Sequence, residues 1–186
     1  MDVLVELENA KQKGVPLVCI ETMDQISLMK SIGLKFKEDY GLVLWDVVNS
    51  FSAINNTSRQ FIQSLSGDRL EEAISSAENM PERSMMIILN AHRFIQDSMV
   101  STAIMKRRES FKENHRMIIC LGSYFDLPRE LRNDMIIIIE EAPTDEQLRK
   151  NADSLLSAAN VVSSTKILDS MVSATRGLSL FNAEQI

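Results

Sequence analysis

The chain has 186 residues, a hydrophobic content of 45%, a charged content of 25% and a formal net charge of −6. These values predict one globular domain of ordinary size with room for a small appendage. They argue against a dedicated nucleic-acid binder, which usually carries a basic patch, and no apolar run approaches the roughly 20 residues of a membrane span. The acidic N-terminus lacks the basic start and apolar stretch of a secretory signal, so we expect a cytoplasmic protein.

Five short apolar runs recur along the first 140 residues, and helix-like sequence follows each of them. Because the runs are continuous rather than alternating, they predict strands buried on both faces, as in a parallel sheet covered by helices. The pattern is typical of a nucleotide-binding α/β domain. The runs are Pro16–Glu21, Leu42–Val48, Met85–Asn90, Met117–Leu121 and Met135–Ile139.

Helical patterns precede and separate these runs. Asp24 is a candidate N-cap for the second helix. The polar segment Ser50–Ser66 shows the apolar pattern of neither a helix nor a strand, and Asn55–Ser58 inside it is typical of a loop. The predicted helices cover Val3–Lys13, Asp24–Tyr40, Arg69–Asn79, Phe94–Asn114 and a short stretch around Pro128–Asn133.

After residue 143 the strand signal disappears and the chain reads as helices. Thr144 and Gln147 form a capping box that opens the first of them. Because the last helix would have barely two turns before Ile186, we expect a fragment, or a domain that normally continues. We therefore predict a core over residues 1–143 and a truncated helical lid-like segment over residues 144–186.

The turn after the first strand is the position of the phosphate loop in a nucleotide-binding α/β domain. That loop has the pattern G-x-x-x-x-G-K-[ST], in which glycines let backbone N–H groups surround an anion and lysine adds positive charge. The sequence here contains no glycine and no lysine, and two carboxylates stand where phosphate charge would lie. It reads Glu21, Thr22, Met23, Asp24 and Gln25. We therefore expect no nucleotide cofactor.

Several short sequence segments resemble motifs of AAA+ ATPases. Met85–Ala91 is similar to a Walker B strand, and Asp126–Arg132 is similar to the L-P-x-E-L segment ahead of the fifth strand. Ala142–Leu148 resembles the P-x-x-E-x-L start of the lid, and Arg176–Ser179 resembles the G-L-S/T turn inside it. Over roughly residues 15–186 the chain resembles the degenerate N-terminal AAA-like domain of bacterial, plastid and phage ATPases, which carry an intact ATPase domain further on.

This resemblance implies a five-stranded parallel, P-loop-NTPase-like sheet in the order 5-1-4-3-2, flanked by helices. The first and fourth strands are then neighbours. We expect Cys19 and Cys120 to lie close together on these central strands as buried, reduced thiols.

Two further positions depart from an active ATPase. Asn90 and Ala91 stand where Walker B has the aspartate that positions magnesium and the glutamate that activates water. We therefore expect no catalytic residue and no enzyme in this chain alone. The resemblance implies a non-catalytic interaction and oligomerisation domain whose partners are AAA+ ATPase subunits or domains. Two alternatives stay open: an ATPase with an unconventional phosphate site, and a nucleic-acid factor similar to clamp-loader subunits.

Arg129 and Arg132 lie where the resemblance places an arginine finger. Such an arginine stabilises charge on a γ-phosphate held by a neighbouring subunit, so it can persist when its own domain has lost the ATP site. The alternative is a solvated arginine paired with Glu130 or Asp134.

The remaining titratable residues match no motif. His92 and His115 are far apart in the sequence and predict no zinc site. The basic run Lys106–Arg108 is followed closely by acidic residues, which favours a solvated helix face over phosphate binding. Four carboxylates lie near strand ends, where α/β proteins place ligands, but their spacing supports no metal site. They are Glu21, Asp24, Asp46 and Asp126.

Overall fold

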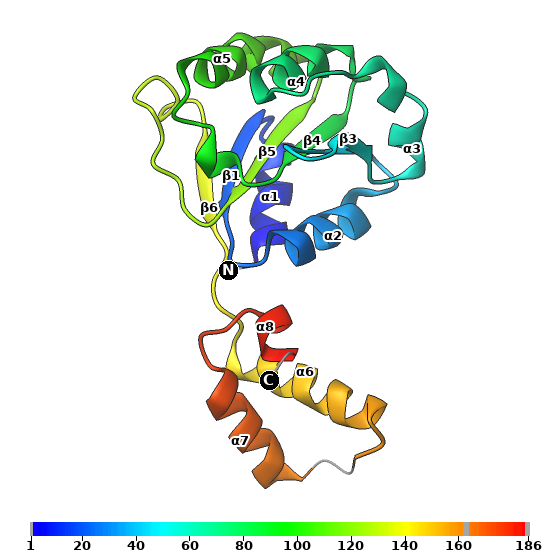
Figure 1. Cartoon of the computed structure of the whole chain (residues 1–186), viewed down its shortest axis with the longest axis vertical. Coiled ribbons are helices and arrows are strands. Elements are labelled where there is room, and N and C mark those ends of the chain that lie inside the picture. Colours follow the sequence, from blue (N-terminus) through cyan, green and yellow to red (C-terminus); the bar gives the residue numbers. More distant parts are fainter. Residues whose placement is uncertain (1, 162–163, 185–186) are drawn as a thin grey trace. The chain divides into compact units, whose positions relative to one another are not determined.

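The computed structural model describes residues 2–161 and 164–184. Its chain divides into two compact units, Met1–Glu140 and Glu141–Ile186 (Figure 1). The outer ends of both predicted domains, residue 1 and residues 185–186, lie outside the described residues. The first unit is an α/β core and the second is helical. The lid-like role of residues 144–186 stays a prediction.

The core contains a six-stranded sheet in the order β3-β2-β4-β5-β1-β6. The five predicted strands are all present, pair in parallel and follow the predicted order 5-1-4-3-2, so the predicted α/β fold is confirmed. The difference is a sixth strand, β3, which pairs antiparallel with β2 at one edge. The strands are β1 (Leu17–Glu21), β2 (Gly41–Asp46), β3 (Ser50–Ala53), β4 (Ser84–Ile88), β5 (Met117–Gly122) and β6 (Ile136–Ile139).

The central strands are buried on both faces, which is why their sequences are continuously apolar. Cys19 and Cys120 are register partners on β1 and β5, and both are buried free thiols. The adjacent Cys120 thiol and burial together raise the pKa of Cys19. Both effects favour the neutral thiol, so this pair packs as small apolar side chains.

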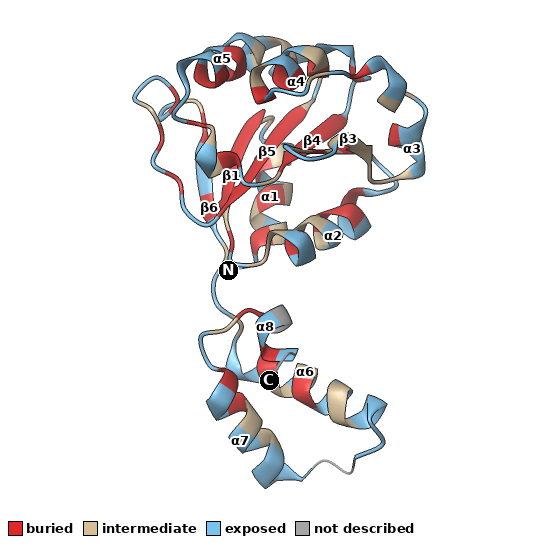
Figure 2. Ribbon diagram, in the orientation of Figure 1, coloured by how far each residue is buried: buried red, intermediate tan, exposed pale blue. Residues whose placement is uncertain are grey.

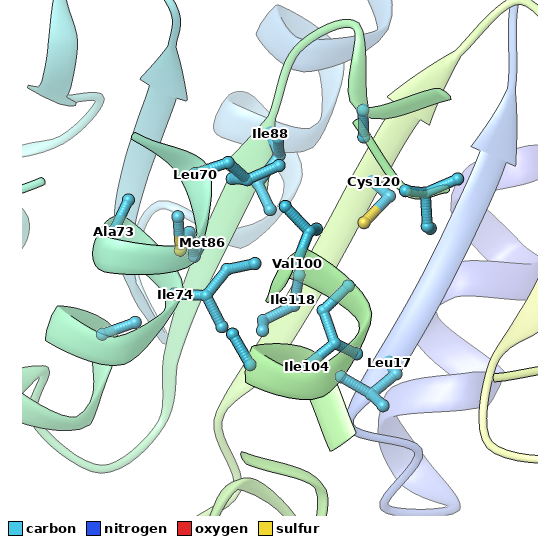
Figure 3. Packing of buried hydrophobic residues seen from close by; sticks show 14 of the residues in the cluster. Leu17, Leu70, Ala73, Ile74, Met86, Ile88, Val100, Ile104, Ile118 and Cys120 are labelled. Atoms are coloured by element: carbon cyan, nitrogen blue, oxygen red, sulfur yellow. The ribbon is translucent and has the colours of Figure 1, made fainter. Parts of the chain in front are cut away.

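Two helices cover one face of the sheet (Figures 1 and 2). Figure 3 shows Ile74 of one helix and Val100 and Ile104 of the other gathered over Met86 and Ile118 of the sheet. The apolar residues of the longer helix recur three, four and seven positions apart, which forms one stripe on a helix. The helices are α4 (Leu70–Ser76) and α5 (Ser98–Glu113).

Two other helices cover the opposite face. Leu7, Ile32 and Phe36 pack there against alternate residues of the same strands, including Val18 and Ile20. Both helices begin with an aspartate whose carboxylate accepts a backbone N–H of the first turn. They are α1 (Val3–Gln12) and α2 (Gln25–Phe36).

The ambiguous segment after β2 contains β3 and a one-turn helix, α3 (Asn56–Arg59), where a loop was expected. Asn55 organises it through four side-chain hydrogen bonds. Its Oδ1 accepts the N–H groups of Ser58, at 3.0 Å, and Leu42, at 3.2 Å, while its Nδ2 donates to the carbonyls of Lys37, at 3.1 Å, and Tyr40, at 2.6 Å. The bonds to Lys37, Tyr40 and Leu42 are long-range and join the end of α2 and the start of β2 to α3, whereas the Ser58 bond is the local cap of α3.

The short helix predicted around Pro128–Asn133 is wrong. The described chain forms successive turns there, in which the Leu131 N–H donates to Pro128 O and the Asp134 N–H donates to Leu131 O, both at 3.0 Å. Leu131 is fully buried and anchors the turns to the core. The connection from β5 to β6 therefore has turns where the sequence predicted a helix.

The described residues of the second unit, 141–161 and 164–184, contain three helices. The predicted capping box of Thr144 and Gln147 is present at the start of the first. Leu148, Val172 and Ala183 form its small buried cluster. The helices are α6 (Asp145–Ala158), α7 (Thr165–Thr175) and α8 (Leu180–Glu184). No helix in the described parts of the chain has the length and apolar character needed to cross a membrane.

Replacing Asn55 with Ala should lower the free energy of unfolding by about 2–4 kcal/mol. Loss of the helix cap costs about 1 kcal/mol, and the backbone groups left without a partner add about 1–3 kcal/mol. The control is Asn56→Ala, an exposed neighbour expected to change stability by less than about 0.5 kcal/mol. Urea unfolding of both variants measures the difference, and equal effects would contradict the role assigned to Asn55.

Candidate functional site

The carboxyl ends of the parallel strands meet at one edge of the core sheet, where α/β proteins place ligands. We call this the carboxyl edge. It is formed by Thr22–Gln25 after β1, Asn90–Arg93 after β4, Ser123–Phe125 after β5 and Glu140 after β6. The predicted phosphate-loop and Walker B positions therefore lie on the same edge.

The N-terminus of α2 is capped by the chain itself. Asp24 Oδ1 accepts the Ser27 N–H at 3.0 Å, and Thr22 Oγ1 accepts the Asp24 N–H at 2.9 Å. In a phosphate loop, free N–H groups at this helix end point toward an anion. Here a carboxylate of the same chain takes that place, so the residues do not fit a bound triphosphate.

A pair of amide side chains ties the phosphate-loop position to the Walker B position. Gln25 Nε2 donates to Asn90 Oδ1 at 3.1 Å, and the Asn90 N–H donates to Gln25 Oε1 at 2.8 Å. Asn90 has a left-handed backbone with φ of 54°, a conformation that asparagine tolerates better than most residues. Ala91 is buried in the core. The phosphate-loop and Walker B positions thus lie side by side, and their residues Gln25 and Asn90 bind each other.

Two glutamates brace the neighbouring strands. Glu21 Oε1 accepts the Phe125 N–H at 2.8 Å, and the Thr22 hydroxyl donates to the Glu140 carboxylate. Burial, with the nearby charges of Asp24 and Asp2, raises the pKa of Glu140 above its ordinary value, although the Thr22 bond opposes this. Glu140, which no sequence motif indicated, is therefore an acid of the carboxyl edge with a raised pKa.

His92 is a second residue of the edge that the sequence did not assign. Its Nε2 lies 3.4 Å from Ser123 Oγ, and its ring centroid is 5.8 Å from that of Tyr124. A Cβ at position 122 would lie 2.7 Å from His92 Nδ1, so glycine permits this close approach. Burial, and then the charge of Arg93, lower the pKa of His92, which favours the neutral imidazole.

The other carboxylates named from the sequence have local structural roles. Asp46 accepts the N–H groups of Val48, at 2.8 Å, and Asn49, at 2.9 Å, in the turn between β2 and β3. Asp126 pairs with Arg132 at 3.4 Å. Within residues 2–161 and 164–184, no group of three or more histidine, cysteine or acidic side chains is arranged to hold a metal ion.

The candidate finger arginines lie in the turns after Pro128. Arg132 Nε donates to the carbonyl of Leu127 at 2.9 Å, while its guanidinium pairs with Asp126 rather than with the expected Glu130 or Asp134. The side chain is still 59% exposed. Arg129 is exposed on the same segment. Both arginines are accessible to a neighbouring molecule, and Arg132 is held in a defined direction.

Two arginines of the basic run on α5 form ion pairs. Arg107 pairs with Glu78 at 2.8 Å, and Arg108 pairs with Glu109 at 2.8 Å and with Asp134 at 2.7 Å. Arg108, which is 45% exposed, agrees with the expected solvated helix face, whereas Arg107 is only 15% exposed.

Replacing Glu140 with Gln should preserve stability at neutral pH and remove part of its pH dependence. Because the pKa of Glu140 is raised above 4.5 in the folded state, the folded protein still holds this proton at pH values where the unfolded chain has released it. The stability of the wild type therefore decreases as the pH rises above about 4.5. Glutamine keeps an oxygen acceptor for Thr22 without the charge. Urea unfolding at about pH 4 and about pH 7 compares the two proteins. Identical pH slopes would show that Glu140 is not perturbed.

Comparison with known proteins agrees with this architecture. A family model described as the N-terminal domain of SpoVK-like AAA ATPases matches residues 4–139. The AAA domain-containing protein ycf46 of Trieres chinensis is 20% identical over 167 residues, which cover 89% of this chain and 33% of that protein. The chain thus spans about a third of the length of this curated relative.

Solved structures share the fold at low sequence identity. A variant of Thermotoga maritima RuvB is 14% identical with a TM-score of 0.59, over 98% of this chain and 57% of that one. The replication initiator DnaA bound to AMPPCP and single-stranded DNA is 10% identical with a TM-score of 0.61, over 96% and 57%. The HORMA:CdnC:Trip13 complex of E. coli MS115-1 is 14% identical with a TM-score of 0.62, over 99% and 69%.

These similarities correct one expectation. The sequence suggested that the chain is not an enzyme, but the matching family is one of ATPases, and the fold is shared with DnaA bound to the nucleotide analogue AMPPCP. The strand order, the six-stranded sheet and the family match agree with one another. The chain belongs to the family of N-terminal domains of SpoVK-like AAA ATPases.

Proposed function

We propose that this domain is a protein-interaction and oligomerisation module of a larger AAA ATPase assembly. The observation that supports this most directly is the closure of the carboxyl edge by internal bonds. Asp24 caps α2, and Gln25 pairs with Asn90, while the sheet order of the family is kept. The fold is kept although side chains of the chain itself occupy the phosphate position. This combination favours assembly with other domains as the function.

The length of the relative supports the same proposal. The curated relative is about three times as long as this chain, because the matched region covers 33% of it. A domain of this family can therefore occur beside further domains in one polypeptide. We propose that the partners of this chain are AAA ATPase domains or subunits.

A protein partner fits the surface charge better than nucleic acid does. The DnaA structure with a similar fold holds single-stranded DNA, so the fold by itself does not exclude such a ligand. The present chain, however, has a net charge of −6, and two arginines of its basic run are ion-paired. Nucleic-acid binding depends mainly on free positive charge facing the phosphates.

The loop of residues 21–25 is expected to show no micromolar affinity for Mg·ATP. Its carboxylates repel a triphosphate by on the order of 1–4 kcal/mol for each pair of like charges about 4 Å apart, and the N-terminus of α2 is already capped. Isothermal titration calorimetry provides the measurement. A micromolar dissociation constant would contradict the proposal and favour an unconventional phosphate site.

Within the assembly we propose that Arg132, or its neighbour Arg129, acts on a nucleotide held by an adjacent subunit. Replacing Arg132 with Ala should leave stability within about 0.5 kcal/mol, since the side chain is largely exposed. ATP turnover of the assembled ATPase should fall by about 10³-fold. Arg129→Ala tests the neighbour.

The control for this experiment is Arg59→Ala, because Arg59 is an exposed arginine of α3, away from the turns that carry Arg129 and Arg132. Turnover should be unchanged in that variant. If neither Arg129→Ala nor Arg132→Ala lowers turnover in an intact assembly, both arginines are ordinary surface residues and the contribution of the domain is architectural.

A further inference from the structure

Large apolar side chains are exposed along the carboxyl edge. Met23 is 73% exposed, Tyr124 is 63% exposed and Val48 is 83% exposed, and Ile26 and Val47 are also exposed. A single exposed apolar residue is normal on a protein surface, but a group of them rimmed by polar residues is typical of an interaction site. We call these five residues the apolar row.

Hydrogen bonds between the strand ends show that these residues belong to one continuous edge. The Phe125 N–H binds Glu21, which joins the segment of Tyr124 to the segment of Met23. Gln25, beside Ile26, binds Asn90 after β4. The Leu89 N–H donates to Trp45 O at 3.1 Å, which joins the end of β4 to β2, and Val47 and Val48 lie in the turn that follows β2. The row therefore draws on the ends of β1, β5 and β2, and the polar end of β4 lies between those of β5 and β2.

The charge around the row is predominantly negative. Glu21, Asp24, Asp46 and Glu140 lie at the same strand ends, and all four carboxylates bind groups of the chain itself. Arg93 adds a positive charge at the edge, while His92 favours its neutral form. Opposite charge at the rim of an interface steers and selects its partner. The preferred ligand therefore combines apolar side chains with positive charge.

We propose that the apolar row binds an apolar segment of a partner protein in which lysine or arginine flanks the apolar side chains. This inference rests on the proposed interaction function and assigns a surface to it. A second copy of this chain fits less well, because a two-fold contact through the row would place the same carboxylates opposite each other. The partner is thus a different protein or domain with a basic, apolar segment.

A randomised library of displayed 12-residue peptides, selected on the whole chain, tests this proposal. The recovered peptides should be enriched in apolar residues next to lysine or arginine. Their affinity, measured by fluorescence anisotropy, should fall at least tenfold for the double variant Met23→Ser/Tyr124→Ser. It should be unchanged for Leu34→Ser, because Leu34 is similarly exposed, at 71%, on α2 outside the row.

A second variant isolates the charge. Asparagine caps a helix about as well as aspartate, so Asp24→Asn should keep the fold while removing one negative charge. Peptide affinity should fall several-fold, and its dependence on salt should weaken. Circular dichroism and urea unfolding confirm that each variant is folded.

Three outcomes would overturn the proposal: enrichment of acidic peptides, equal binding to the Met23→Ser/Tyr124→Ser variant, or recovery of no binding peptide. Peptides that bind elsewhere on the chain would remove the apolar row as the docking surface but leave an interaction domain. The proposed function itself fails in a different experiment, if the chain does not assemble with any AAA ATPase domain.

Discussion

Burial of the central strands on both faces is the constraint on which the rest of the core depends. β1, β4 and β5 present apolar side chains to two helical layers at once, so each crossover must return the chain to the same end of the sheet. Parallel strands with one direction of crossover bring all their carboxyl ends to a single edge. The position of the candidate site is therefore a consequence of packing, and it persists when the residues at the edge change.

The carboxyl edge shows how a ligand position can be closed without altering the fold beneath it. Asp24 satisfies the helix N-terminus, and the Gln25–Asn90 pair connects two strand ends through neutral amides. Each contact pairs a polar group of the edge with another group of the same chain. Such contacts stabilise the free domain, since buried or helix-terminal polar groups are costly when left without partners. Apolar side chains, including Met23 and Tyr124, are exposed at the same strand ends.

This arrangement is consistent with a domain that contributes to an ATPase through contact. The family match relates the chain to AAA ATPases, while the chain covers about a third of a curated relative. Arg132 is directed by Leu127 O and Asp126, and the apolar row lies at the ends of the strands. Tyr124 of the apolar row and Arg132 lie on the same connection between β5 and β6.

The sequence by itself predicted the α/β fold, because continuous apolar runs are typical of strands buried on both faces, and a resemblance in short motifs implied their order. The run of β6 is an exception to the predicted burial, since Ile136, Ile137 and Ile139 of this edge strand are exposed. It also predicted the capping box of Thr144 and Gln147, which depends on residues close in sequence, but it predicted a loop where Asn55 and Ser58 form a second capping box. It did not predict β3, α3 or the turns after Pro128, since Asn55 and Leu131 act through contacts with distant elements. Likewise, only the tertiary structure brought Glu140 beside Thr22, Gln25 beside Asn90 and His92 beside Ser123, because neighbouring strand ends belong to segments far apart along the chain.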